Sequence, residues 1–255
     1  MKPLFITLLA LCPLLSVAQR NLNSSATSPS PASRYDFPAR IRTADLSLAS
    51  SGDLSSLALT VNQLHGLGRS NRFRIGYGLR FTATAANQLD YITAPAKLTS
   101  GQESIVALFT ESINNNLDTL RLGKTQTNSL NISIHLEYGI TRRLAVGFNI
   151  DAIGFSAGAQ QSGTFIANGP TRSSLHNTVQ VAKPTPFNLL LMGDSDRGSL
   201  NSEAYARYRV SPKVSLRGGI GFQFTEYTTT RKLTLDNDRF RRKNAGVQLD
   251  VAYHF

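Results

Sequence analysis

The stretch that decides the fold of this chain reads FRIGYGLRFTAT and spans residues 73–84. Its odd-numbered positions carry apolar side chains, whereas its even-numbered positions carry arginine, glycine or threonine. Because successive side chains on a β-strand point to opposite faces, this alternation predicts a strand with one apolar and one polar face. The stretch is also longer than the five or six residues that are usual in globular sheets.

The same alternation recurs along the chain, strongly in its second half and more weakly in a first hairpin. The predicted strands are residues 41–50, 55–64, 72–85, 126–139, 143–155, 199–210, 213–227 and 244–255. At about 3.4 Å per residue and a tilt near 40°, eleven residues rise roughly 28 Å, which crosses an apolar membrane band about 25 Å tall. A soluble β-sandwich also has one apolar face per strand and is the alternative fold.

The connections between these strands fall into two groups. Links at one end are short, whereas three of the four links at the other end are long, at residues 86–125, 156–198 and 228–243. Short periplasmic turns and long outer loops are typical of outer-membrane barrels. We therefore predict an all-β fold: a closed, antiparallel, up-and-down transmembrane β-barrel of about eight strands with long extracellular loops.

The N-terminal region predicts export. Residues 1–18 combine a charged start, an apolar stretch and small residues before Ala18, which is the pattern of a cleaved signal peptide. Residues 19–40 are rich in Ser, Asn, Ala and Pro and are predicted to be a flexible periplasmic lead-in, which leaves residues 41–255 for the barrel. Lipidation of Cys12 is an alternative, although Leu11 stands where lipoprotein signals need a small residue.

Charge and cysteine content restrict the partners. The formal net charge of +11 favours a polyanion, and predicted export disfavours nucleic acid, which leaves acidic lipid headgroups or lipopolysaccharide phosphates. The single cysteine lies in the predicted signal peptide, so the mature chain would have neither disulfides nor thiolate metal sites. The histidines show no metal-ligand spacing, and we expect no metal and no cofactor.

The last strand resembles that of bacterial outer-membrane β-barrel proteins. It ends in Phe255 and carries apolar residues at every second position before it, including Val251 and Tyr253. Together with the signal peptide, this resemblance covers residues 41–255 and points to uncharacterised small barrels of OmpA/OmpX-like architecture. It implies an outer-membrane location and recognition of Val251, Tyr253 and Phe255 by the barrel-assembly machinery. It implies no activity.

The polar faces of the predicted strands carry a set of charged residues that would point inward: Arg74, Arg80, Glu137, Asp151, Glu203, Arg207, Arg209, Arg217 and Asp250. An eight-stranded barrel has an interior just wide enough for side chains. Because unpaired buried charge is costly, we expect these groups to pair and plug the lumen. A narrow polar conduit is the alternative.

A candidate catalytic set lies on one strand. Ser133, His135 and Glu137 share a face, and some outer-membrane lipid A deacylases use Ser, His and Glu. Alternate residues on a strand are about 7 Å apart, which we expect to exceed hydrogen-bond reach for most rotamers. An inward-facing lumen network is therefore favoured over catalysis.

A last cluster is basic and falls in the third long link and its flanks: Arg231, Lys232, Arg239, Arg241, Arg242 and Lys243. It could bind lipopolysaccharide phosphates or form a solvated hairpin tip. We therefore predict a non-enzymatic outer-membrane barrel with a structural, envelope or ligand-contact role. A narrow pore or transport protein is the first alternative, and a lipid A-modifying enzyme is the second.

Overall fold

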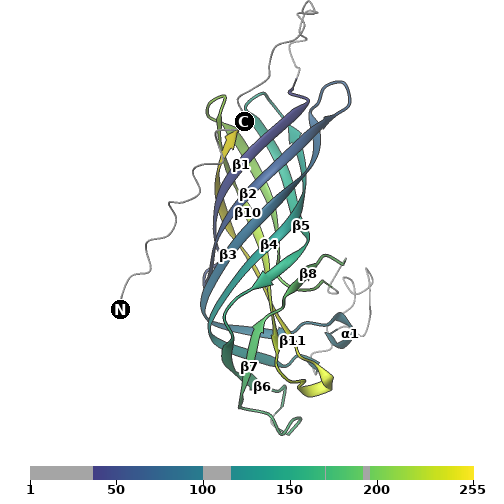
Figure 1. Ribbon diagram of the computed structural model, residues 1–255, viewed down its shortest axis with the longest axis vertical. Helices are drawn as coiled ribbons and strands as arrows, with labels where there is room; N and C mark the ends of the chain where they lie inside the picture. The colour runs from purple at the N-terminus through teal and green to yellow at the C-terminus, as the bar shows by residue number, and fades with distance from the viewer. Residues whose placement is uncertain (1–36, 100–115, 170, 192–195) are drawn as a thin grey trace, which may run out of the picture. The chain divides into compact units, whose positions relative to one another are not determined.

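The computed structural model describes residues 37–99, 116–169, 171–191 and 196–255. The predicted signal peptide, most of the predicted lead-in and Cys12 lie outside these residues. Eight long strands build the main body (Figure 1): β1 (Arg40–Ser50), β2 (Leu54–Leu67), β3 (Phe73–Thr93), β4 (Thr119–Gly139), β5 (Leu144–Ala157), β9 (Leu200–Arg209), β10 (Val214–Thr229) and β11 (Arg239–His254).

These eight strands close into a barrel. Each pairs antiparallel with its neighbours in the order β1, β2, β3, β4, β5, β9, β10, β11, and β11 returns to β1. In the closing pair, Ala44 lies opposite Tyr253 and Leu48 lies opposite Leu249. The predicted closed, antiparallel barrel of eight strands is therefore confirmed, including its first hairpin.

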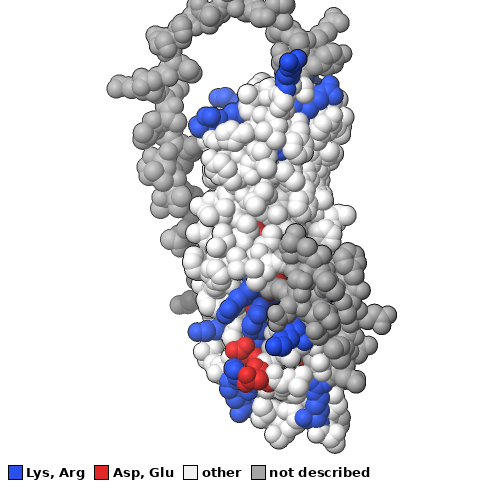
Figure 2. Space-filling model, turned by 90° about the vertical axis from the view of Figure 1, so that its right-hand side faces the viewer, with Lys and Arg blue, Asp and Glu red and all other residues white. Residues whose placement is uncertain are grey.

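The outer surface of the barrel is an apolar belt. Large apolar side chains that are exposed on these strands include Leu46, Leu57, Val61, Ile75, Leu79, Phe81, Ile132, Ile134, Phe148, Leu216, Ile220, Phe222, Val247 and Leu249. Figure 2 shows a middle zone that is nearly all white, with Lys and Arg gathered at the two ends. So large an exposed apolar surface requires a lipid environment. The barrel is therefore a membrane barrel. Among the described residues, no helix is long and apolar enough to span a membrane.

Beyond the belt, part of the chain closes a second and smaller ring. The outer ends of β3 and β4 pair with each other, and β4 then pairs with β6 (Gln161–Ile166). β6 pairs with β7 (Thr178–Pro184), β7 pairs with the outer end of β10, and β11 joins β10 back to β3. We call this six-stranded closure the outer ring. It lies at the end of the barrel opposite Phe255 (Figure 1).

The outer ring has an apolar core, unlike the polar lumen of the membrane barrel. Its buried members are Leu89, Tyr91, Leu120, Leu122, Phe165, Ala182, Tyr227, Leu233 and Phe240, joined by Leu54, Ala86 and Ala167. The rings of Phe165 and Phe240 lie 6.2 Å apart, and those of Tyr91 and Tyr227 lie 5.1 Å apart, both edge to face. Such pairs add to the stability given by burial itself.

The outer ring corrects the prediction that residues 86–125, 156–198 and 228–243 are loops. Each of these links contains paired strand in the structure. The alternation of apolar and polar residues did not reveal these strands, because it changes phase where the membrane barrel meets the outer ring. Even-numbered residues of β3 point inward up to Ala86, whereas Leu89 and Tyr91 point inward beyond Gln88, which has a φ of +50°. On β4 the phase changes between Leu122 and Thr125.

A β-bulge in β5 makes a similar phase change inside the membrane barrel. Ser133 of β4 lies opposite Asp151, but the next residue along, Ile132, lies opposite Ile153, so Ala152 is the extra residue. The bulge turns both Asp151 and Gly154 inward and leaves Phe155 facing lipid. The Phe155 ring contacts Phe187 of the short edge strand β8 (Phe187–Leu189) at 5.7 Å.

The core of the outer ring gives a first prediction. Phe240→Ala removes a fully buried ring and should destabilise the outer ring by about 3–5 kcal/mol. We expect new protease cleavage in residues 89–93, 119–122 or 161–184, while the membrane barrel still resists detergent and still migrates differently on gels before and after boiling. Phe155→Ala, which removes a lipid-exposed ring, is the matched control. Unchanged proteolysis of Phe240→Ala would show that the ring does not depend on this core.

Candidate functional site

The lumen of the membrane barrel contains a hydrogen-bonded network to which seven of the eight strands contribute charged residues and β2 contributes Asn62, which donates to Asp45. Among the described lumen residues, four buried arginines face five buried carboxylates: Arg74, Arg80, Arg207 and Arg217 against Asp45, Glu137, Asp151, Glu203 and Asp250. A closed polar interior requires nearly equal numbers of positive and negative side chains. The structure thus places eight of the nine predicted lumen residues in one buried network and adds Asp45.

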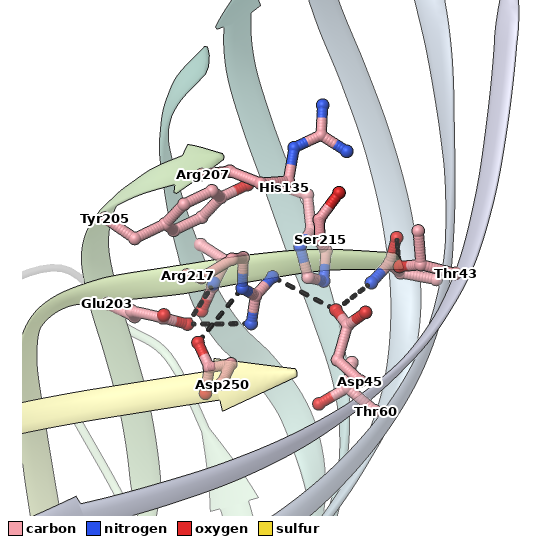
Figure 3. A network of polar contacts seen from close by, with 12 residues as sticks. Thr43, Asp45, Thr60, His135, Glu203, Tyr205, Arg207, Ser215, Arg217 and Asp250 are labelled. Atoms are coloured by element: carbon pink, nitrogen blue, oxygen red, sulfur yellow. Dashed lines mark hydrogen bonds and ion pairs between the residues drawn. The ribbon is translucent and has the colours of Figure 1, made fainter. Parts of the chain in front are cut away.

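Arg217 of β10 is the centre of this network (Figure 3). Its guanidinium donates to Asp45 of β1 at 3.0 Å, to Glu203 of β9 at 3.4 Å and to Asp250 of β11 at 3.0 Å. Its Cζ also lies 4.5 Å from the centroid of the Tyr205 ring. One side chain therefore ties four strands together, two of which form the closing pair of the barrel.

A second cluster surrounds Glu137, nearer the end that carries Phe255. Its carboxylate accepts from Arg74 at 2.6 Å and from Arg207 at 2.7 Å, and Tyr205 donates its hydroxyl at 3.3 Å. Arg209, the ninth predicted lumen residue, is only half-buried at the rim, where it lies 3.4 Å from Nδ1 of His254.

The third cluster lies in the part of the lumen that is nearer the outer ring. Arg80 donates to Asp151 at 3.1 Å and to the side-chain oxygen of Asn149. Asn131 and Asn201 complete the coordination of Asp151 with amide donors. The prediction did not include these asparagines or Asp45. Asp45 could have been found, because Thr43, Asp45 and Ser47 alternate with Ala44, Leu46 and Leu48.

The lumen is also covered at the Phe255 end. Phe37 is 6% exposed and packs between the guanidinium groups of Arg72 and Arg74, whose Cζ atoms lie 5.5 and 5.3 Å from its ring centroid. Its ring occupies the space beside Gly139, where a Cβ atom would lie 2.6 Å from it. Residues 37–40 are therefore part of the barrel and not of a free lead-in.

The Ser133, His135 and Glu137 set is only partly assembled. Ser133 Oγ lies 2.8 Å from His135 Nε2, so the expectation that their spacing prevents a hydrogen bond was wrong. The rotamers of the two side chains incline toward each other along the strand. Glu137, however, is engaged by Arg74, Arg207 and Tyr205. Ser133 and His135 are at most 1% exposed, so both side chains are buried in the lumen network.

The predicted basic cluster divides between the surface and a buried ion-pair group. Arg239 and Arg241 bind Glu226 of β10 at 2.8 and 2.9 Å, on the outside of the outer ring. Arg231 donates to Gln180, Lys232 pairs with Asp236, Arg242 donates to Asn244, and Lys243 lies over the Phe224 ring. The cluster is therefore not a single patch of solvated cations.

This arrangement shifts the pKa of Glu226. Burial alone would raise the pKa of its carboxyl, but the hydrogen bonds and charges of Arg239 and Arg241 outweigh burial and hold that pKa below its ordinary value. A lowered folded-state pKa means that the ion pair stabilises fully above the ordinary carboxyl pKa and loses its effect as pH falls through the lowered value.

The remaining predicted residues lie on the surface. Val251, Tyr253 and Phe255 all face the lipid side, with exposures of 51%, 44% and 61%. They form the outward face of the last strand, where the resemblance places an assembly signal. In the described part of the chain, no group of three or more His, Cys, Asp or Glu residues is arranged to hold a metal ion.

Comparisons with known proteins find only low similarity. No family model and no curated protein matches the chain. Three of the solved structures similar to it are a neisserial surface protein and two outer membrane proteins. Neisserial surface protein A is 10% identical over 85% of this chain and 96% of its own, with a TM-score of 0.34. Yersinia pestis Ail is 10% identical over 84% and 99%, with a TM-score of 0.34. A major outer membrane protein from Thermus thermophilus is 12% identical over 86% and 100%, with a TM-score of 0.35.

The Arg217 cluster gives a second prediction. Arg217→Met leaves three buried carboxylates without their shared cation and should destabilise the barrel by roughly 3–5 kcal/mol. Urea unfolding of the protein in lipid vesicles measures the change. Arg69→Met, at an exposed turn position, removes the same charge and should have little effect. Equal stability of the two variants would mean that Arg217 is not essential to the network.

Glu226 gives a third prediction. Proteolysis of the outer ring should accelerate as pH falls from the ordinary carboxyl pKa through the lowered pKa of Glu226, because protonation of Glu226 abolishes its ion pairs with Arg239 and Arg241. Glu226→Gln should be cleaved faster than the wild type at neutral pH and should show a weaker pH dependence. A variant that kept the full pH dependence would assign the transition to another carboxyl group.

Proposed function

We propose that this chain is a non-conducting, non-enzymatic outer-membrane barrel that holds a rigid outer ring at the cell surface for structural or ligand contact. The observation that carries the proposal is the filled interior: paired charges in the membrane barrel are followed by an apolar core in the outer ring. The barrel then serves as an anchor, and the function resides in what it holds outside the membrane.

The packing of the lumen supports an anchor over a conduit. A void beside Arg80, Asn201 and Gln223 has a volume of about 10 Å³, which is the space of a single water molecule. Gln223 donates across the lumen to Ser56, and Tyr227 donates to the backbone carbonyl of Gln126 on the opposite wall. An ion would have to displace several of these contacts at once, so we retain the pore only as the outcome that would overturn the proposal.

The orientation of the outer ring supports a surface role. The short turns and the last residue of the barrel lie at the opposite end, and short turns are periplasmic in outer-membrane barrels. The outer ring is then extracellular. Lys124 and Lys243 are exposed where the apolar belt meets the outer ring, at the level where lipopolysaccharide phosphates would lie. We propose these two exposed side chains as contacts for those phosphates.

Conductance is the direct test of this proposal. Refolded protein in planar bilayers should show no resolved single-channel steps, because both the charge network and the outer ring close the lumen. Phe240→Ala should also remain silent, since the charge network persists when the outer ring loosens. Discrete, reproducible steps from the wild type would contradict the anchor and favour a transport role. Steps from Phe240→Ala alone would show that the outer ring is the seal.

A further inference from the structure

A groove on the lipid-facing side of β1, β2 and β3 combines an apolar floor with a charged end. Its volume is about 510 Å³, within the range of small-molecule sites. The apolar side chains that line it include Val61, Leu79 and Ile132. Arg42 and Phe255 line it where the groove approaches the end of the barrel with the short turns. It belongs neither to the lumen nor to the outer ring.

Polar side chains gather on this face although the surrounding belt is apolar. Arg42, Gln63 and Tyr77 occupy directly opposite positions on three neighbouring strands. Arg42 Nε donates to Gln63 Oε1 at 2.7 Å, and the amide nitrogen of Gln63 donates to Tyr77 at 3.4 Å and lies 2.7 Å from His65 Nε2. The His65 and Tyr77 rings also stack, with centroids 6.3 Å apart. The face is thus an ordered polar row.

The charge of Arg42 distinguishes this row from the rest of the barrel. Each buried arginine of the lumen meets at least one carboxylate. Within the described residues, Arg42 instead makes its side-chain hydrogen bond to a neutral amide, through Nε, and forms no ion pair. Its two terminal nitrogens are therefore available to an anion outside the protein. A guanidinium at the edge of an apolar membrane region is stabilised by such an anion.

The physics of the membrane identifies the occupant. Lipid tails are as apolar as the groove, so the groove alone gains little by holding a chain. Selectivity must come from the head group, and guanidinium groups bind phosphate oxygens in a bidentate manner. The occupant must therefore have an acyl chain and a phosphate, and excess negative charge strengthens its attraction to Arg42.

We propose that this groove is a binding site for an anionic phospholipid of the leaflet at the Phe255 end. The phosphate binds the terminal nitrogens of Arg42, and one acyl chain lies along Val61 and Leu79 toward Ile132. Gln63 accepts a hydrogen bond from Arg42 Nε and so holds the guanidinium in place, which leaves the two terminal nitrogens of Arg42 for the ligand. The site depends on the membrane barrel alone and is independent of whether the lumen conducts.

Native mass spectrometry in a neutral detergent tests the site. Folded protein is titrated with phosphatidylglycerol and with phosphatidylcholine of the same acyl chains. The wild type should bind the first phosphatidylglycerol about tenfold more tightly than phosphatidylcholine, the size expected of one charge-assisted contact. Arg42→Gln should lose this preference, and Arg42→Lys should keep part of it. Gel migration before and after boiling verifies that each variant is folded.

Two further variants separate a built site from general attraction to a basic end. Arg143→Gln removes an exposed charge from the β4–β5 turn at the same end of the barrel and should keep the tenfold preference. Val61→Trp fills the groove and should weaken phosphatidylglycerol binding although Arg42 remains. Equal binding of the two lipids by the wild type would overturn the proposal. So would equal loss of preference in Arg42→Gln and Arg143→Gln, or undiminished binding in Val61→Trp.

Discussion

An eight-stranded barrel has so narrow an interior that a charge placed inside it must meet an opposite charge from another strand. The rest of this structure follows from that constraint. Arg217 satisfies it by binding carboxylates from β1, β9 and β11, and Glu137 satisfies it by binding arginines from β3 and β9. Each ion pair is also a cross-link between strands, so the charged interior adds to the backbone pairing that holds the cylinder in register. A chain without disulfides in its barrel needs such cross-links.

The two rings solve the same packing problem in different surroundings. In the membrane barrel the outside is apolar because lipid surrounds it, and the inside is polar. In the outer ring, where water surrounds the chain, the inside is apolar and ion pairs such as Glu226 with Arg239 lie outside. The apolar and polar faces change sides where β3 and β4 shift their alternation by one residue, near Gln88 and Gly123. One pair of continuous strands thereby presents opposite chemistries to its two environments.

Much of the membrane barrel could be predicted from local alternation, because each strand segment must separate lipid from lumen. The eight strands, the buried charge of Arg74 or Asp250 and the lipid-facing Phe255 all follow from that one rule. The outer ring could not be predicted in this way. Its phase change at Gln88 breaks the alternation, and β6 and β7 gain their stability from pairing with β4 and β10, which are distant in sequence. The Ser133 and His135 contact depends on rotamers, and the groove beside Arg42 depends on the relative positions of three strands.

The central claim is that the charge network fills the lumen and keeps water out, and chemical access to one serine tests it most directly. Ser133 is fully buried in the lumen, and the only cysteine of the chain is Cys12, which can be replaced by serine. In that background, Ser133→Cys should not react with a charged, water-soluble thiol reagent while the barrel is folded in vesicles, and should react fully after unfolding. Ser70→Cys, in the exposed β2–β3 turn, should react at once. Modification of folded Ser133→Cys at the rate of Ser70→Cys would reveal a water-filled lumen and contradict the account.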